Sequence, residues 1–233
     1  LEVNPRASRT VPFVAKSKGI PVAKIAAKVM LGENLNSILN DYKINELKNF
    51  NVKESVFPFN KFDGVDLKLG PEMKSTGEFM WIDETFLSSY IKSLIACGNI
   101  LPSKGTVFIS IDNDNKKFII EIAQKLKELD FNLLATKGTA EYLNSNNIKT
   151  KIVNKVKEGN PHVVDSLINN EIQLVINTTK TQSSIRDSYS IRRTSLMYNI
   201  PYYTTIAGAK VAVDAIEHMK TQEFTIKSLQ TIN

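Results

Sequence analysis

The stretch Thr106-Val-Phe-Ile-Ser-Ile111 is a short run rich in β-branched and aromatic residues, and Phe131-Asn-Leu-Leu-Ala135 is the next such run. Between the two, apolar residues recur at helical spacing at positions 118, 119, 122, 123 and 126. A strand, a helix and a second strand in this order are typical of a βαβ unit, whose strands run parallel in one sheet. This stretch decides the fold class, because the segments that follow repeat its pattern.

The alternation of strands and helices continues through residue 219. Further strands are predicted at residues 152–153, 172–176 and 202–206, and helices at 139–144, 163–168, 185–198 and 207–219. The sequence therefore predicts an α/β fold, a parallel five-stranded sheet with flanking helices that cover both of its faces.

The chain before residue 99 has a less regular pattern. Pro21 precedes apolar residues at helical spacing and Gly32 follows them, which predicts a helix. Further segments are expected to be extended (54–59), loop-rich (64–77) and helical (86–94). Residues 99–105 include Pro102 and are the best candidate for a boundary, so we expect two domains, 1–98 and 99–233.

Composition limits the function classes. With 42% hydrophobic and 23% charged residues, the 233-residue chain is typical of a soluble globular protein. No apolar run approaches the roughly 20 residues that span a bilayer and no signal peptide is recognisable, so no membrane contact is expected. The net charge of +6 is spread along the chain without aromatic partners, which argues against a nucleic-acid partner. The single Cys97 excludes an internal disulfide and favours a cytoplasmic location. Because there is no initiator methionine, we expect a fragment of a longer protein.

Hydrogen-bond donors recur where the predicted strands end. In open parallel sheets, ligands bind beyond the carboxyl ends of the strands, where helix N-termini also favour anions. These ends carry hydroxyls, an amide and lysines: Ser110, Thr136-Lys137-Gly138-Thr139, Lys155, Asn177-Thr178-Thr179 and Thr204-Thr205. Any one of these residues could equally be a helix cap. Their recurrence at ends that converge in space nevertheless predicts a site for a small phosphate-bearing ligand.

Catalytic chemistry is less well represented. The two histidines lie away from the strand ends, His162 in a loop close enough to Lys155 to neighbour the ligand and His218 on the last predicted helix. No metal-binding cluster or Ser-His-Asp order is recognisable, and no general base is obvious. The site is therefore expected to sense its ligand. A stand-alone lyase stays open, with Asp112 and Asp187 as acid/base candidates, and so does a purely structural oligomerisation domain.

Several motifs, in order along essentially the whole chain, resemble the carbamoyl phosphate synthetase large-subunit family. They are EVNPRASRT (2–10), PFNKF (58–62), LGPEMKSTGE (69–78), ATKGTA (135–140), NKV (154–156), INTT (176–179) and IRR (191–193). The resemblance implies the C-terminal part of that subunit, with a regulatory domain like methylglyoxal synthase preceded by the tail of the second ATP-grasp unit. It implies an ATP-dependent ligase that makes carbamoyl phosphate for pyrimidine and arginine biosynthesis.

For residues 1–98, the resemblance implies part of an active site that uses ATP and Mg²⁺ or Mn²⁺. Glu2 and Asn4 match its metal-binding positions, and Arg6 matches a catalytic basic residue at the phosphate end. A hard cation prefers oxygen ligands, which agrees with Glu2 and Asn4. The nucleotide loop and the other ligands are not in this chain, so the fragment alone is expected to be regulatory and inactive. The resemblance also implies a small-subunit glutaminase and further large subunits as partners.

For residues 99–233, the resemblance implies a site for the nucleotide effectors UMP and IMP. The matching positions are Ser110, Lys116, Thr136, Lys137, Thr139, Lys155, Asn177, Thr179 and Ser188. Ornithine is implied as a further effector, with Glu54, Tyr202 and Thr204 at matching positions. The sequence departs from the family at 180–184 and 207–209, which leaves the effector preference open. Retention of Thr-Lys-Gly-Thr and Asn-Thr-Thr disfavours a form that senses N-acetylglutamate.

Overall fold

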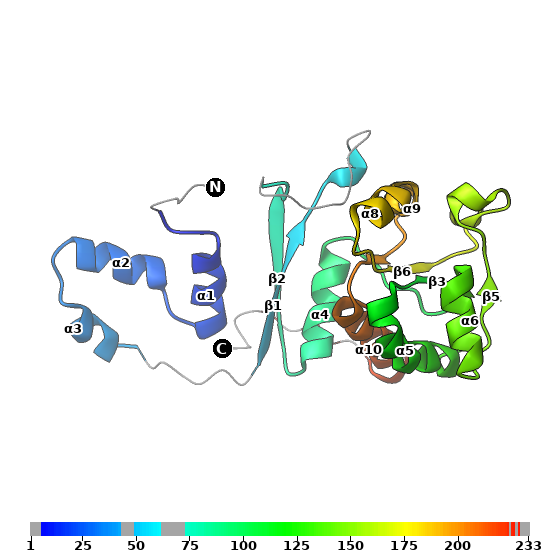
Figure 1. Ribbon diagram of the computed structural model, residues 1–233. Coiled ribbons are helices and arrows are strands. Elements are labelled where there is room, and N and C mark those ends of the chain that lie inside the picture. The colour runs from blue at the N-terminus through cyan, green and yellow to red at the C-terminus, as the bar shows by residue number, and fades with distance from the viewer. Residues whose placement is uncertain (1–5, 43–48, 62–72, 224, 227, 229–233) are drawn as a thin grey trace. The chain divides into compact units, whose positions relative to one another are not determined.

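The computed structural model describes residues 6–42, 49–61, 73–223, 225–226 and 228, and the chain divides into two compact units (Figure 1). Unit 1 comprises the described residues of Leu1–Val56, Ser75–Cys97 and Phe224–Asn233, and unit 2 those of Phe57–Lys74 and Gly98–Glu223. Among the described residues, none of the helices combines the length and the apolar character that crossing a bilayer requires.

Unit 1 combines helices with an antiparallel pair of strands. Its elements are α1 (Thr10–Lys18), α2 (Val22–Met30), α3 (Leu35–Asn40), β1 (Phe50–Val56), β2 (Gly77–Asp83) and α4 (Phe86–Ala96). β1 pairs with β2 from Phe50↔Asp83 to Val56↔Gly77, and α4 packs against both strands. The buried side chains of Ile82, Ile91 and Leu94 belong to these elements. The helices predicted after Pro21 and at 86–94 are present as α2 and α4, whereas α1 and β2 were not predicted.

A buried lysine ties the C-terminal segment into unit 1. Lys92 on α4 is only 9% exposed, and its Nζ donates to Asp83 Oδ2 and to the carbonyl oxygen of Thr225, each at 2.5 Å. The same ammonium lies 5.7 Å from the ring centroid of Trp81. An ammonium this buried needs such partners, because its desolvation is otherwise costly.

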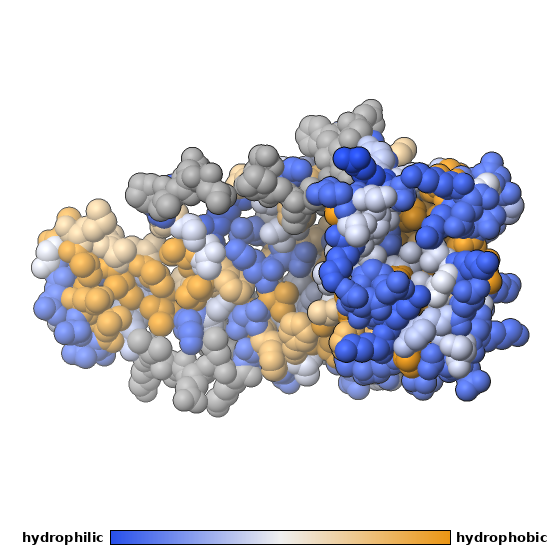
Figure 2. Space-filling model, viewed as in Figure 1, coloured by the Kyte–Doolittle hydropathy of each residue, from blue (hydrophilic) through white to orange (hydrophobic). Residues whose placement is uncertain are grey.

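Unit 1 also presents an apolar surface on α2 and the turn that follows it. Met30 and Leu31 are 87% and 85% exposed, and Val14, Val29 and Leu35 are exposed as well. Figure 2 shows the hydrophobic colour concentrated over α1, α2 and α3, whereas the visible face of unit 2 is mostly hydrophilic. A contiguous exposed apolar area of this kind is typical of a surface that contacts another protein segment.

Unit 2 contains the predicted five-stranded parallel sheet. Its strands are β3 (Thr106–Ser110), β4 (Asn132–Ala135), β5 (Lys151–Ile152), β6 (Leu174–Asn177) and β7 (Tyr202–Tyr203), in the order β5-β4-β3-β6-β7. All neighbouring strands pair in parallel, so the predicted fold class is confirmed. The helices are α5 (Lys116–Glu128), α6 (Lys137–Ser145), α7 (Val163–Ile168), α8 (Gln182–Asp187), α9 (Tyr189–Met197) and α10 (Ile206–Thr221), with short 3-10 turns η1 (Phe59–Lys61), η2 (Asn113–Asn115) and η3 (Val156–Glu158).

Helices cover both faces of this sheet (Figure 1). On one face, Phe108 and Val175 belong to a buried cluster that includes Val163 and Leu167 of α7 and Ile191 of α9. Because side chains alternate along a strand, the neighbours of Phe108 and Val175 point to the opposite face, where α5 packs against α6 and α10. The sheet is therefore a buried central layer, and its carboxyl edge is the place where polar side chains can gather.

After residue 105, two predicted elements differ from the structure by more than a shift of one or two residues at an end. The helix expected at 185–198 is two helices, α8 and α9, which meet at Ser188. The strand expected at 202–206 contains only Tyr202 and Tyr203, since Thr205 is the N-cap of α10. The Thr205 hydroxyl accepts the Gly208 N–H at 3.1 Å, and this cap makes a helix start preferable to a longer strand.

Candidate functional site

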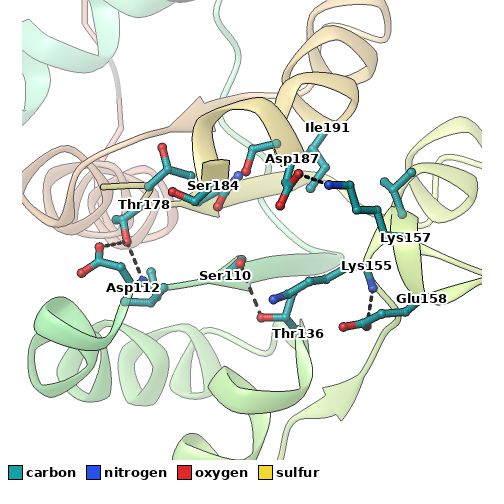
Figure 3. Close-up of a pocket in the computed structure, with 15 residues that line it drawn as sticks. Ser110, Asp112, Thr136, Lys155, Lys157, Glu158, Thr178, Ser184, Asp187 and Ile191 are labelled. Carbon is teal, nitrogen blue, oxygen red and sulfur yellow. Dashed lines mark hydrogen bonds and ion pairs between the residues drawn. The ribbon is translucent and has the colours of Figure 1, made fainter. Parts of the chain in front are cut away.

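A cavity of about 390 Å³ opens at the carboxyl edge of the unit 2 sheet (Figure 3). The ends of β3, β4 and β6, the turn η3 and the segment around α8 form its walls. Most of its lining residues carry a hydroxyl, amide, amine or carboxylate group, and three are aliphatic: Ser110, Ile111, Asp112, Thr136, Lys155, Val156, Lys157, Glu158, Asn177, Thr178, Thr179, Ser184, Asp187, Ser188 and Ile191. A cavity of this size and polarity suits a small, highly oxygenated ligand.

Hydroxyl groups from β3 and β4 form one wall. Thr136 precedes α6, and its Oγ1 lies 3.4 Å from Ser110 Oγ. The Thr136 hydroxyl lies 3.4 Å from the Thr139 hydroxyl and accepts no backbone N–H of α6, so the first peptide N–H groups of the helix point out of its N-terminus without a side-chain cap. Hydroxyls and a helix N-terminus together favour an anion at this end of the cavity.

Two lysines approach from the η3 wall. Lys155 Nζ points into the cavity in Figure 3, and no described residue makes a hydrogen bond or ion pair with it. The backbone N–H of Lys155 donates to Glu158 Oε2 at 2.8 Å, which fixes the turn that carries both lysines. Lys157 Nζ instead lies 2.5 Å from Oδ1 of Asp187, the last residue of α8, on the facing wall. One amine is thus available to a ligand and the other is already paired.

The end of β6 supplies an amide and two further hydroxyls. Asn177 is almost fully buried, and its Nδ2 donates to the Tyr202 hydroxyl at 2.7 Å. Thr178 Oγ1 donates to Asp112 Oδ2 at 2.6 Å and accepts the Asp112 backbone N–H at 3.1 Å. These bonds tie the β3 and β6 ends together, so the polar wall is held in place by the sheet edge.

Asp112 is held as a carboxylate. Burial raises its pKa, but hydrogen bonds from the Thr178 hydroxyl and the Asn115 amide outweigh burial, so that the pKa lies below its usual value. Asn115 Nδ2 donates to Asp112 Oδ2 at 2.7 Å. An ionised Asp112 can accept protons or hydrogen bonds, but it is a poor proton donor near neutral pH.

Six of the nine positions predicted to hold a nucleotide effector line the cavity. They are Ser110, Thr136, Lys155, Asn177, Thr179 and Ser188. Lys116, Lys137 and Thr139 do not line it. The Lys116 ammonium lies 5.9 Å from the ring centroid of Tyr142, and Lys137 is exposed at the first residue of α6. Thr139 is 2% exposed, and its hydroxyl accepts the Ile111 N–H at 3.1 Å, so it supports the wall from behind.

Comparison with known proteins agrees with this architecture. Residues 118–204 match the family model of the MGS-like domain. The chain contains an MGS-like domain. It is also 50% identical over 230 residues to a carbamoyl phosphate synthase large chain of Myxococcus xanthus, a match that covers 99% of this chain and 21% of the relative. The large chain of Archaeoglobus fulgidus is 47% identical over 231 residues, with coverages of 99% and 21%.

A third relative is a separate polypeptide described as the C-terminal section of the large chain. This protein of Methanopyrus kandleri is 47% identical over 238 residues, which cover 100% of this chain and 44% of the relative. The chain thus spans about a fifth of the full large chains it matches. The similarity over the whole chain confirms the predicted family resemblance. Among solved structures, a methylglyoxal synthase of Elizabethkingia anophelis matches with TM-score 0.38 and 18% identity, over 48% of this chain and 79% of that one.

Several cavity residues of the MGS-like domain were not predicted as effector contacts. Thr178 was included among the strand-end donors but not among the effector contacts, whereas Lys157 and Glu158, which follow Lys155 closely, were in neither set. Asp112 and Asp187, considered only as acid/base candidates, both line the cavity. His162, expected to neighbour the ligand, does not line the cavity; it caps α7, where its Nδ1 lies 3.0 Å from Asp165 Oδ2.

Of the remaining predicted residues, those that the structure describes are not among the residues that line the cavity. Glu2 and Asn4 fall outside the described residues, and Arg6 is exposed. Within the described ranges, no group of three or more His, Cys, Asp or Glu side chains could hold a metal ion. Glu54 belongs to unit 1, where burial raises its pKa, whereas Tyr202 and Thr204 belong to unit 2.

Proposed function

We propose that this chain is the C-terminal regulatory portion of a carbamoyl phosphate synthase large chain, and that its MGS-like domain binds the nucleotide effectors UMP or IMP. The observation that carries the proposal is the cavity at the carboxyl edge of the sheet. It combines the Lys155 amine, which has no hydrogen-bond or ion-pair partner in the described part of the chain, with the hydroxyls of Ser110 and Thr136 beside the N-terminus of α6. This donor set suits a phosphate, and the neighbouring polar walls suit the hydroxyls of a ribose.

The available interactions are strong enough for an effector. Micromolar binding corresponds to about 8 kcal/mol net of the cost of association. A hydrogen bond to a charged group contributes roughly 1.5–3 kcal/mol. A phosphate that accepts from Lys155, from two or three hydroxyls and from peptide N–H groups can reach this value.

The parent protein is proposed to be an ATP-dependent ligase that makes carbamoyl phosphate for pyrimidine and arginine biosynthesis in the cytoplasm. Residues 1–98 would be the tail of its second ATP-grasp unit, with Arg6 at the phosphate end and Glu2 and Asn4 as ligands of Mg²⁺ or Mn²⁺. The exposed apolar residues of α2 support this assignment, because the rest of such a unit would cover them. We also propose a small-subunit glutaminase and other large subunits as partners of the parent protein. Ornithine is proposed as a further effector, with Glu54, Tyr202 and Thr204 as its contacts.

Isothermal titration calorimetry of the 233-residue chain with UMP and with IMP tests the effector site. Saturable binding of either nucleotide is expected. Circular dichroism on the same sample establishes that the chain is folded. If the folded chain gives no heat of binding with either nucleotide at millimolar nucleotide concentrations, nucleotide sensing is removed from the proposal.

A stand-alone lyase of the methylglyoxal synthase type is the second candidate. It gains support from Asp112 and Asp187, which both lie on the cavity wall. It also needs a proton donor, which the lowered pKa of Asp112 disfavours. Incubation with dihydroxyacetone phosphate is expected to give no methylglyoxal. Formation of methylglyoxal that is lost in Asp112→Asn would favour the lyase.

A further inference from the structure

The two lysines of the cavity differ in their electrostatic state. Lys155 has no ion-pair partner among the described residues, whereas Lys157 is paired with Asp187. The pair joins η3 to the end of α8 across the cavity, as Figure 3 shows. Both residues line the cavity, and their side chains are 75% and 42% exposed, so the bond is reachable by a dissolved ligand.

The net charge of the cavity means that this ion pair affects the binding of an anion. The lining contains two lysines and three carboxylates, those of Asp112, Glu158 and Asp187, so its formal charge is negative by one unit. A dianionic phosphate that enters this cavity meets Lys155 as an available cation and Asp187 as a nearby like charge. The Asp187 carboxylate occupies the position at Lys157 that a ligand oxygen would otherwise take.

We propose that Asp187 is a resident counterion that competes with the anionic ligand for Lys157, and thereby sets the affinity and charge selectivity of the effector cavity. This inference rests on the proposed anion site and adds a residue that opposes binding. A dianion can displace the carboxylate, since it attracts Lys157 more strongly than one negative charge does. A monoanion gains little by the exchange, because it only replaces one unit charge by another.

The energy of the pair permits such an exchange. Ion pairs between exposed side chains are weak, far weaker than the summed hydrogen bonds of a bound phosphate. The stability of unit 2 does not depend on a bond this weak, so its removal should leave the fold unchanged. Displacement of Asp187 by a ligand is therefore feasible without rearrangement of the sheet.

Binding of inorganic phosphate and of UMP by Asp187→Asn, Lys157→Gln and the double variant tests the inference. Asp187→Asn should bind both probes about three- to tenfold more tightly than the wild-type chain, because Lys157 is released and a like charge is removed. In the Lys157→Gln background, the same substitution should give a distinctly smaller gain. The gain for acetate, a monoanion, should be smaller than the gain for phosphate, because the carboxylate that the substitution removes repels a monoanion about half as strongly as a dianion.

Asp114→Asn is the matched control. Asp114 also pairs with a lysine of the segment that leads into α8, Lys180, but it does not line the cavity. Equal gains from Asp114→Asn and Asp187→Asn would reduce the effect to net charge and overturn the proposal. No gain from Asp187→Asn, including no detectable binding of phosphate by either chain, would also overturn it. Phosphate binding that responds to Asp187→Asn without any UMP binding would leave the counterion intact and refute the nucleotide assignment alone.

Discussion

Replacement of Lys155 by alanine is the sharpest test of the effector site, because Lys155 supplies the cavity's one amine without a described partner. The substitution removes a charge-assisted hydrogen bond to the ligand, which contributes roughly 1.5–3 kcal/mol. Lys155 is exposed, so solvent screening should place the loss toward the lower end of this range. The dissociation constant for UMP should therefore rise by at least about tenfold.

The assay is isothermal titration calorimetry of both chains in the same buffer and at the same salt concentration. Lys149→Ala is the control, since Lys149 is an exposed lysine that precedes β5, at the opposite edge of the sheet from the cavity. It removes the same charge and should change the dissociation constant by less than about twofold, through long-range electrostatics alone. Equal effects of the two substitutions, or an unchanged constant in Lys155→Ala, would show that the phosphate does not bind at this edge.

Three further outcomes are expected. Thr139→Val should lower the thermal midpoint of unfolding, because it leaves the buried Ile111 N–H without its acceptor and so reduces the unfolding free energy by about 1–3 kcal/mol. Thr179→Val, on the cavity wall, should change the midpoint less. The pKa of Asp112 is lowered in the folded chain, so its carboxylate stabilises the fold above its unfolded pKa, and this stabilisation is lost as the pH falls through its folded pKa. Urea titrations at pH 7 and pH 3 should therefore show a smaller decrease in unfolding free energy for Asp112→Asn than for the wild type. Burial and, to a lesser extent, the nearby Glu54 charge raise the pKa of Cys97 from 9.0 to about 11. Iodoacetamide at pH 8 should therefore alkylate the folded chain about 100-fold more slowly than the urea-unfolded chain. Equal rates would contradict the burial of this thiol.

The sheet was predictable because its signal is local. Each strand in the central part is a short apolar run, as in Thr106–Ser110, and each following helix shows its own apolar periodicity, as in Lys116–Glu128. Helix boundaries depend on finer chemistry. The break at Ser188 and the early start of α10 at Ile206 are set by single caps and turns, which hydrophobic periodicity does not register.

The site was predictable in part for a topological reason. Once a parallel sheet is assumed, Ser110, Thr136 and Asn177 must share one edge, and the structure places all three on the cavity. Whether a side chain of a helix faces the cavity or the core depends on its position around the helix axis. Thr139, one turn into α6, therefore supports the wall and does not line it. The pairing of Lys157 with Asp187 joins residues 30 positions apart, and no sequence pattern encodes it.

The bond between Lys92 and the Thr225 carbonyl joins positions 133 residues apart, and the entire sheet of unit 2 lies between them in the chain. During synthesis, α4 leaves the ribosome long before its last partner exists. The Lys92 ammonium can be satisfied by Asp83 at that stage, but its second acceptor arrives only after α10 has emerged. Unit 1 can thus complete this contact only after unit 2 has been synthesised, so a nascent chain that stalls before Thr225 would carry a unit 1 in which Lys92 lacks its second acceptor.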